Sequence, residues 1–146
     1  MTVDAVVVLW DLPINSQEFL SAPQFLQTED KAMFVYDHGV VGEFSTIVFD
    51  GVEASCFTFY ECCSPEQVAA YDRVIMVEDS SWATELASRK VSTKVTSKHY
   101  RIFIDEVGCY DVLSAAVSKP LPGNLINQEI SRKSGSNRGA GSNLAL

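Results

Sequence analysis

Cysteine and histidine are the residue types here that could bind zinc or supply a nucleophile. The chain has four cysteines and two histidines, namely Cys56, Cys62, Cys63, Cys109, His38 and His99. Cys62 and Cys63 are adjacent and lack the two-residue spacer that lets both thiolates reach one tetrahedral ion. We therefore expect free thiols and predict that the protein needs no metal or organic cofactor.

A nucleophilic cysteine would need a base beside its thiol. A hairpin formed by residues 99–105 and 109–117 could bring His99 toward Cys109. Counting back from its turn, however, places Cys109 roughly opposite Asp105, so His99 and Cys109 are not directly paired. This spacing disfavours catalysis by the two side chains.

Two pairs of acidic residues, Glu78-Asp79 and Asp105-Glu106, could in principle act as general acid and base. Both pairs are sequence neighbours at the ends of predicted elements, where solvated caps and turns place carboxylates. The chain also lacks a glycine-rich phosphate loop, a nucleophile elbow and a paired-histidine zinc motif. The sequence therefore predicts no catalytic, cofactor-binding or metal-binding residues.

A basic cluster is the most distinctive local feature. Its five cations fall within thirteen residues that contain no acid, namely Arg89, Lys90, Lys94, Lys98 and Arg101. The cluster could bind a phosphate or a partner. We favour a solvated linker whose cations complement the C-terminal end of the preceding helix.

Strand patterns surround these residues. Residues 44–49 and 52–60 are aromatic and β-branched on either side of Asp50-Gly51, which predicts a tight β-hairpin. A second hairpin is expected about residues 106–108. Residues 3–10 read as a buried strand, and further strands are expected at residues 31–37 and 74–77.

Helix starts are marked by capping residues. Asn15 with Glu18 three positions later predicts a short helix or two, extending to about residue 29. The core face of this helical segment would contain four apolar side chains, Phe19, Leu20, Phe25 and Leu26. Ser64, followed by Pro65, predicts another short helix, and Ser80 or Ser81 caps a helix that carries Trp82. Hairpins mixed with short helices indicate an α+β domain with an antiparallel sheet of five or six strands.

The composition divides the chain at about residue 117. Residues 118–146 combine prolines with a Gly/Ser/Asn run, carry four Lys and Arg against one Glu, and are expected to form a flexible tail. Residues 1–117 form the predicted domain, with seven Lys and Arg against eighteen Asp and Glu, a net charge of −11. Twelve of those acids precede Arg73. This acidity argues against a nucleic-acid-coating protein.

Membrane and export segments are not apparent. The apolar run at residues 5–10 is far too short to span a membrane, and the first cation is Lys31, so no basic leader is present. A cytoplasmic location with reduced cysteines is therefore expected. A disulfide framework, allowed by the even number of cysteines, is the competing interpretation.

A resemblance covers residues 78–117. The segment Glu78-Asp79-Ser80-Ser81-Trp82-Ala83-Thr84-Glu85-Leu86, followed by Lys98-His99-Tyr100, resembles a group of small, mostly uncharacterised bacterial cytoplasmic proteins. Some members of that group are similar to immunity proteins. The resemblance implies a small bacterial α+β domain and brings no catalytic residues. The turn at residues 105–109 departs from the polar run typical of the group.

Charge and the lack of a catalytic motif together favour a non-enzymatic interaction module. The most specific version of this hypothesis is an immunity-type inhibitor that binds a basic partner protein. Such a module is expected to bind neither nucleic acid nor a membrane. The alternative is a small hydrolase or ligand-binding enzyme that uses a cysteine, His99 or carboxylates assembled by the fold. A pocket converging on His99, Cys109 or a carboxylate pair would favour the enzyme, whereas a flat acidic face would favour the binder.

Overall fold

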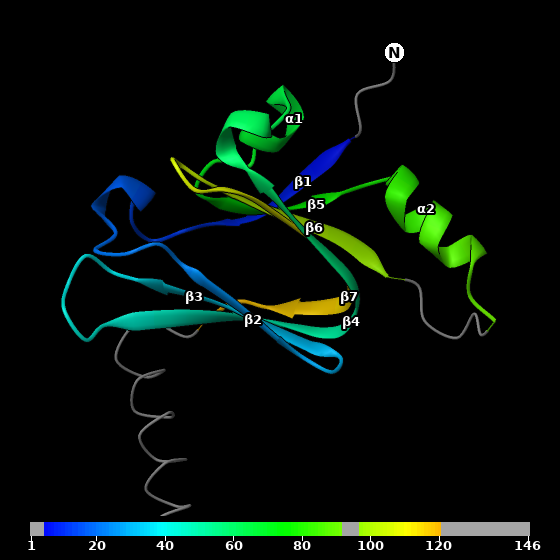
Figure 1. Ribbon diagram of the computed structural model, residues 1–146, viewed down its shortest axis with the longest axis horizontal. Coiled ribbons are helices and arrows are strands. Elements are labelled where there is room, and N and C mark those ends of the chain that lie inside the picture. The colour runs from blue at the N-terminus through cyan, green and yellow to red at the C-terminus, as the bar shows by residue number, and fades with distance from the viewer. Residues whose placement is uncertain (1–4, 92–96, 121–146) are drawn as a thin grey trace, which may run out of the picture.

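A computed structural model describes residues 5–91 and 97–120 of the 146-residue chain. Seven strands and four short helical segments occur in the described residues (Figure 1). The strands are β1 (Val6–Asp11), β2 (Gln24–Thr28), β3 (Lys31–Asp37), β4 (Phe44–Phe59), β5 (Arg73–Val77), β6 (Lys98–Ile104) and β7 (Gly108–Ser118). The helical segments are η1 (Ser16–Glu18), η2 (Tyr60–Cys62), α1 (Pro65–Val68) and α2 (Ser81–Ser88).

One antiparallel sheet contains all seven of these strands, in the order β1-β5-β6-β7-β4-β3-β2. The expected antiparallel sheet is confirmed, but five or six strands was too few. The helical segments have three to eight residues each, so the described part of the molecule is mostly sheet rather than an even mixture.

The hairpin expected at Asp50-Gly51 is wrong. Both residues lie inside β4, a single 16-residue strand whose first part pairs with β3 and whose later part pairs with β7. Gly51 has φ +67°, and a Cβ placed there would lie 2.9 Å from the Cβ of Ala115. Immediately after Gly51, the pairing register of β4 with β7 shifts between Val52 and Ala54. The positive φ that suits a tight turn therefore bends one long strand instead.

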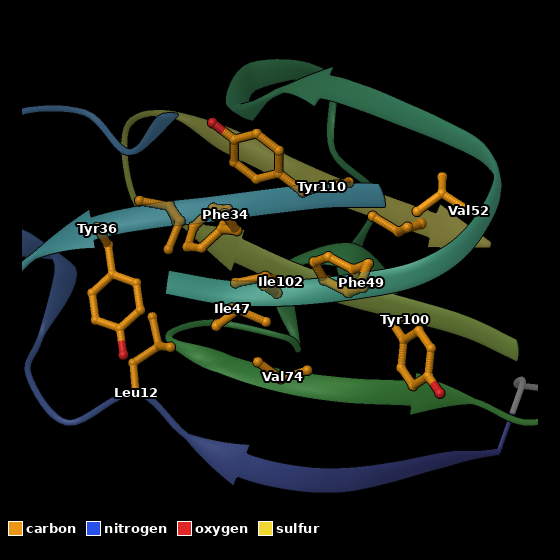
Figure 2. Close-up of a cluster of buried hydrophobic side chains, with 13 residues drawn as sticks. Leu12, Phe34, Tyr36, Ile47, Phe49, Val52, Val74, Tyr100, Ile102 and Tyr110 are labelled. Atoms are coloured by element: carbon orange, nitrogen blue, oxygen red, sulfur yellow. The ribbon is translucent and has the colours of Figure 1, made fainter. Parts of the chain in front are cut away.

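The bend in β4 folds the sheet over a central core. Phe34 and Phe49, from β3 and β4, pack in the same buried cluster as Ile102 and Val112, from β6 and β7. Figure 2 shows these side chains gathered between the strands, with Tyr110 beside Phe34. The ring centroids of Phe34 and Tyr110 lie 5.1 Å apart in an edge-on arrangement. Burial of these large side chains stabilises the folded sheet.

The other face of β6 and β7 carries a second buried cluster. Phe103 and Cys109 belong to it, together with Ile75 and Val77 of β5 and Ala70, which follows α1. Residues at odd positions of β6 and β7 share this face because strand side chains alternate. His99, Arg101 and Asp111 are therefore directed to the side opposite the central core.

The segment between β1 and β3 differs from its predicted helix. Asn15 caps η1, which ends at Glu18, and the chain then forms the strand β2. Phe19 and Phe25 pack against the central core as expected, whereas Leu20 and Leu26 are exposed. Pairing of β2 with β3 outweighed the local capping signal, because a sheet edge offered hydrogen bonds to the whole segment.

Several other predicted elements are present in the structure. The strands at residues 31–37 and 74–77 and the hairpin about residues 106–108 are confirmed. Ser64 and Gln67 form the expected capping box of α1, and Ser80 caps α2. The first strand is present but lies at a sheet edge with its three valines exposed, so its predicted burial is wrong. The predicted tail, from residue 118, lies outside the described residues beyond Pro120.

Candidate functional site

A chain of hydrogen bonds joins Ser80, His99 and Asp111 on the helix-covered face. His99 Nδ1 lies 2.7 Å from Ser80 Oγ, and His99 Nε2 lies 2.6 Å from Asp111 Oδ1. Ser80 Oγ accepts the Ala83 N–H as the N-cap of α2. This arrangement assigns the Ser80 hydroxyl hydrogen to His99 Nδ1 and the imidazole hydrogen to the Nε2 that faces Asp111.

Asp111 is the centre of this network. Its Oδ1 accepts from Arg101 Nε at 2.7 Å, and its Oδ2 accepts from Gln67 Nε2 at 3.2 Å and from the Cys109 thiol at 3.4 Å. Burial alone would raise the pKa of Asp111. The hydrogen bond from His99 and the adjacent charge of Arg101 outweigh burial and hold the pKa at about 2. Asp111 is therefore a paired, ionised carboxylate in the protein interior.

The Ser80–His99–Asp111 network has the residue types of a nucleophile, a base and an orienting acid. The burial of these side chains disfavours nucleophilic catalysis, because a substrate cannot reach them in this conformation. Ser80, His99 and Asp111 are each only 5 to 6% exposed. The Trp82 ring packs edge-on against His99, with ring centroids 5.2 Å apart. Asp111 also pairs with Arg101, which already balances its charge. The network ties α1 and α2 to β6 and β7.

The cysteines are dispersed over this side of the sheet. Cys109 pairs with Phe103 rather than with Asp105, and His99 pairs with Leu113, so the expected separation of His99 and Cys109 along the hairpin is confirmed. Both side chains nevertheless reach Asp111. Burial and the Asp111 charge raise the pKa of the Cys109 thiol, which disfavours a thiolate nucleophile.

The remaining thiols and His38 lie in other surroundings. Cys62 is exposed, and the Cys63 thiol contacts the carbonyl oxygens of Thr58 and Phe59 at 3.5 Å. His38 bonds Ser45 at 2.5 Å, within the β3–β4 connection. Among residues 5–91 and 97–120, no group of three or more His, Cys, Asp or Glu is arranged to hold a metal ion.

A second candidate site lies where η1 meets the turn between β6 and β7. A pocket of about 490 Å³ opens there. Phe19, Ile104 and Val107 give it apolar walls, and Asp105 and Glu106 give it adjacent carboxylates. Its lining contains no Lys, Arg, His or Cys. We call this feature the acidic pocket.

The wall of the acidic pocket is held by carboxylates. Asp37 accepts the backbone N–H groups of Leu20, Ser21 and Gly39 at 2.9 to 3.0 Å. Burial raises the pKa of Asp37, but these hydrogen bonds together lower it below the ordinary value. Asp72 Oδ2 likewise accepts the Ser16 N–H at 3.0 Å. These hydrogen bonds hold the segment that lines the pocket in one conformation.

Further acids surround the pocket. Asp105 lies close enough to both Tyr60 and Tyr71 to affect their electrostatics, and Glu106 lies close enough to affect Tyr60. The charge of Glu61 is the main cause that raises the pKa of Tyr60, with Glu106 and Asp105 adding to it. Burial and then the charge of Asp105 raise the pKa of Tyr71. We call Glu61, Asp72, Asp105 and Glu106 the acidic end.

Five of the seven Lys and Arg among the described residues pair with carboxylates elsewhere. Arg73 pairs with Asp11, and Lys31 pairs with Asp50, both at 3.4 Å. In the described part of the chain, no ion pair joins a Lys or Arg to a carboxylate of the acidic end. Within the described residues, direct ion pairing therefore leaves the negative charge there uncompensated.

The basic cluster predicted from the sequence is divided by the fold. Arg89 pairs with Glu85 one helical turn earlier, and Lys90 pairs with Glu53 at 2.5 Å. Arg101 is directed to Asp111, away from the exposed surface. Lys94 lies outside the described residues. The described cations of this cluster therefore do not form one continuous basic patch.

A smaller pocket of about 350 Å³ lies beside the outer half of β4. It is lined by three aromatic residues, Phe25, Phe57 and Tyr110, together with Ser55, Cys56 and Asp111. Phe57 is half exposed, and its ring centroid lies 5.0 Å from that of Tyr110. Neither pocket described here is lined by His99 or Cys109.

No protein-family model, curated protein or solved structure matches this chain. Of the helices in the described residues, none combines the length and apolar character needed to cross a membrane.

The sequence indicates His99, Asp105 and Glu106 as candidates but does not bring together the members of either site. Its pattern marks Asp111 only as part of a strand and Ser80 only as a helix cap, whereas in the structure Ser80 also donates to His99. One signal was available, because Arg101 and Asp111 are charged residues within predicted apolar strands. Buried charges are seldom unpaired, so these two should have been expected to meet.

Proposed function

We propose that this protein is a non-enzymatic interaction module whose acidic end binds a basic partner protein. The observation that carries the proposal is the acidic pocket, with Asp105 and Glu106 in its lining and no Lys or Arg. A pocket at a carboxylate pair was the feature expected to favour an enzyme, but this lining also contains no His or Cys, and Asp105 Oδ2 is already held by Gln17 and Tyr71. We therefore assign the pocket to partner binding rather than to catalysis. The most specific version of this function is that of an immunity-type inhibitor, which binds and blocks its partner. Support for it comes from the charge and the shape of this one surface.

Uncompensated carboxylates at one end of the molecule favour such a partner physically. A concentrated negative field accelerates encounter with a cationic surface and repels nucleic acid. The acidic pocket adds apolar contact area, which a diffuse acidic surface lacks. Recognition of a basic protein therefore combines steering by charge with a shaped contact.

The test is affinity purification of the full chain from its native host, followed by mass spectrometry. One basic protein should be recovered stoichiometrically, and its retention should weaken as salt rises. The variant E61Q/D105N/E106Q should lose that protein. The matched variant E29Q/D30N/E78Q removes the same charge from exposed positions elsewhere and should retain it. Equal retention by both variants would contradict binding through the acidic end.

A small hydrolase is the second candidate, because the hydrogen bonds from Ser80 through His99 to Asp111 join a hydroxyl, an imidazole and a carboxylate. Opening of α2 at its N-cap would expose Ser80 to substrate. A fluorophosphonate probe tests this directly by adding mass to an activated serine. Labelling that is lost in Ser80→Ala and kept in Ser81→Ala would favour the hydrolase. An unmodified protein would favour the interaction module.

A further inference from the structure

We propose that the acidic pocket binds a single arginine side chain presented by the partner. This inference rests on the proposed function, since it names the group by which a basic partner would be recognised. Three features of the pocket support it: its carboxylates, its apolar walls, and a buried polar group without a hydrogen-bond partner.

The carboxylates provide acceptors for a guanidinium. Asp105 Oδ2 accepts from Gln17 Nε2 at 2.9 Å and from the Tyr71 hydroxyl at 3.2 Å. These two donors orient the carboxylate, and its Oδ1 has no such bond among the described residues. Glu106 is exposed on the neighbouring position of the turn. A guanidinium presents several donors in one plane and suits oriented carboxylate oxygens better than a point charge does.

The buried hydroxyl of Ser16, a residue of the pocket lining, supplies a second observation. Ser16 lines the pocket and is 8% exposed, and its Oγ lacks a hydrogen bond of normal geometry among the described residues, although Tyr71 lies near it. Asp72, which is not among the residues that line the pocket, accepts the Ser16 N–H through its Oδ2, and its buried Oδ1 has no hydrogen bond among the described residues. Buried polar atoms in this state are uncommon in folded proteins. A bound cation with several N–H donors would complement this part of the wall.

The apolar walls suit the rest of the side chain. Phe19, Ile104 and Val107 can contact the three methylene groups of arginine and the weakly hydrated face of its guanidinium. The volume of about 490 Å³ lies in the range of ligand pockets. Asp37 and Asp72 hold the surrounding backbone in place, which lowers the entropic cost of binding.

The experiment uses the isotope-labelled full chain and two probes, Nα-acetyl-arginine N-methylamide and its citrulline analogue. Citrulline has nearly the same shape without the charge. Backbone amide shifts measured by NMR should localise the arginine probe to η1 and the turn about residues 105–107. The affinity of the citrulline probe should be at least about fivefold lower than that of the arginine probe, because the charge-assisted hydrogen bonds are lost.

Matched variants test the assignment. D105N/E106Q should weaken binding of the arginine probe about fivefold. E78Q/D79N removes the same charge from two exposed positions directly after β5 and should leave the affinity within about twofold. Spectra of the free variants establish that each is folded. Equal binding of the two probes, shifts located elsewhere, or equal losses in the two variants would overturn the proposal.

The outcome also separates this inference from the proposed function. If D105N/E106Q still retains a basic partner from the host and the arginine probe does not bind, the pocket assignment fails and the interaction module stands. If the arginine probe binds as expected but no basic partner is recovered, the proposed function fails on its own test.

Discussion

Carboxylates serve opposite purposes in two regions of this molecule. Asp111 lies inside the sheet's helix-covered side, where Arg101, His99 and Gln67 satisfy its oxygens. Asp105 and Glu106 lie at the acidic end, where no cation of the described residues pairs with them. The comparison shows that charge which is paired and buried holds elements together, whereas charge left open remains available to a partner.

Removal of the Asp111 carboxylate should have the largest effect. Asp111→Ala leaves Arg101 buried without its counter-charge and should lower the free energy of unfolding by about 3–5 kcal/mol. Urea denaturation measures this loss. Asp105→Ala, a matched change at the acidic end, should cost no more than about 1 kcal/mol. Similar losses in both variants would erase the distinction between the two regions.

Asp37 sharpens the comparison because it is a buried carboxylate beside the acidic pocket. Its oxygens accept three backbone N–H groups, so Asp37→Ala should cost about 2–3 kcal/mol by leaving those donors unsatisfied. Chemical denaturation measures the cost, and hydrogen exchange should show faster exchange at Leu20 and Ser21. Unchanged protection there would contradict the role assigned to Asp37 in holding the pocket wall.

Acid should remove the stabilisation that the buried carboxylates provide, because their folded-state pKa values are lowered. The folded-state pKa of Asp111 is about 2, below its unfolded value, so its contribution is fully present above about pH 4 and is lost as the pH falls toward 2. The lowered pKa of Asp37 acts in the same direction. Stability measured between pH 5 and 2 should fall by about 2 kcal/mol from Asp111. Asp111→Asn should show a flatter profile; a profile as steep as that of the wild type would contradict the assignment.

The smallest effect is expected at Glu106. Glu106→Gln removes an exposed, unpaired charge and should change the free energy of unfolding by less than about 0.5 kcal/mol, while reducing the repulsion felt by Asp105. Thermal denaturation at low and high salt tests this, because screening should remove any difference from the wild type. A clear destabilisation at both salt concentrations would show that Glu106 has a structural contact after all.

Local signals predicted several elements correctly. The capping box at Ser64 and the hairpin about residues 106–108 depend on residues near one another in the chain, and both are present. Asp50-Gly51 was misinterpreted because a residue pair that favours positive φ suits a bulge as well as a turn. The choice between them depended on β7, sixty residues later, which continues the pairing past Gly51.

The candidate sites were less predictable than the strands. The acidic pocket joins η1 to the β6–β7 turn, and Gln17 reaches Asp105 across 88 residues of sequence. The Ser80–His99–Asp111 network likewise joins a helix cap to two strands. Neither arrangement has a periodicity or spacing that sequence reasoning can follow, since each depends on the register of strands that are distant in the chain.

Sequence alone determined the acidity of the chain, the alternation that makes β6 and β7 strands, and the caps that begin α1 and α2. These properties follow from composition and from interactions a few residues apart. Only the tertiary structure decided that Arg101 neutralises Asp111 while Asp105 stays open. The physical reason is that a charge's partner is set by the sheet order and register, which bring residues together without regard to their separation in sequence.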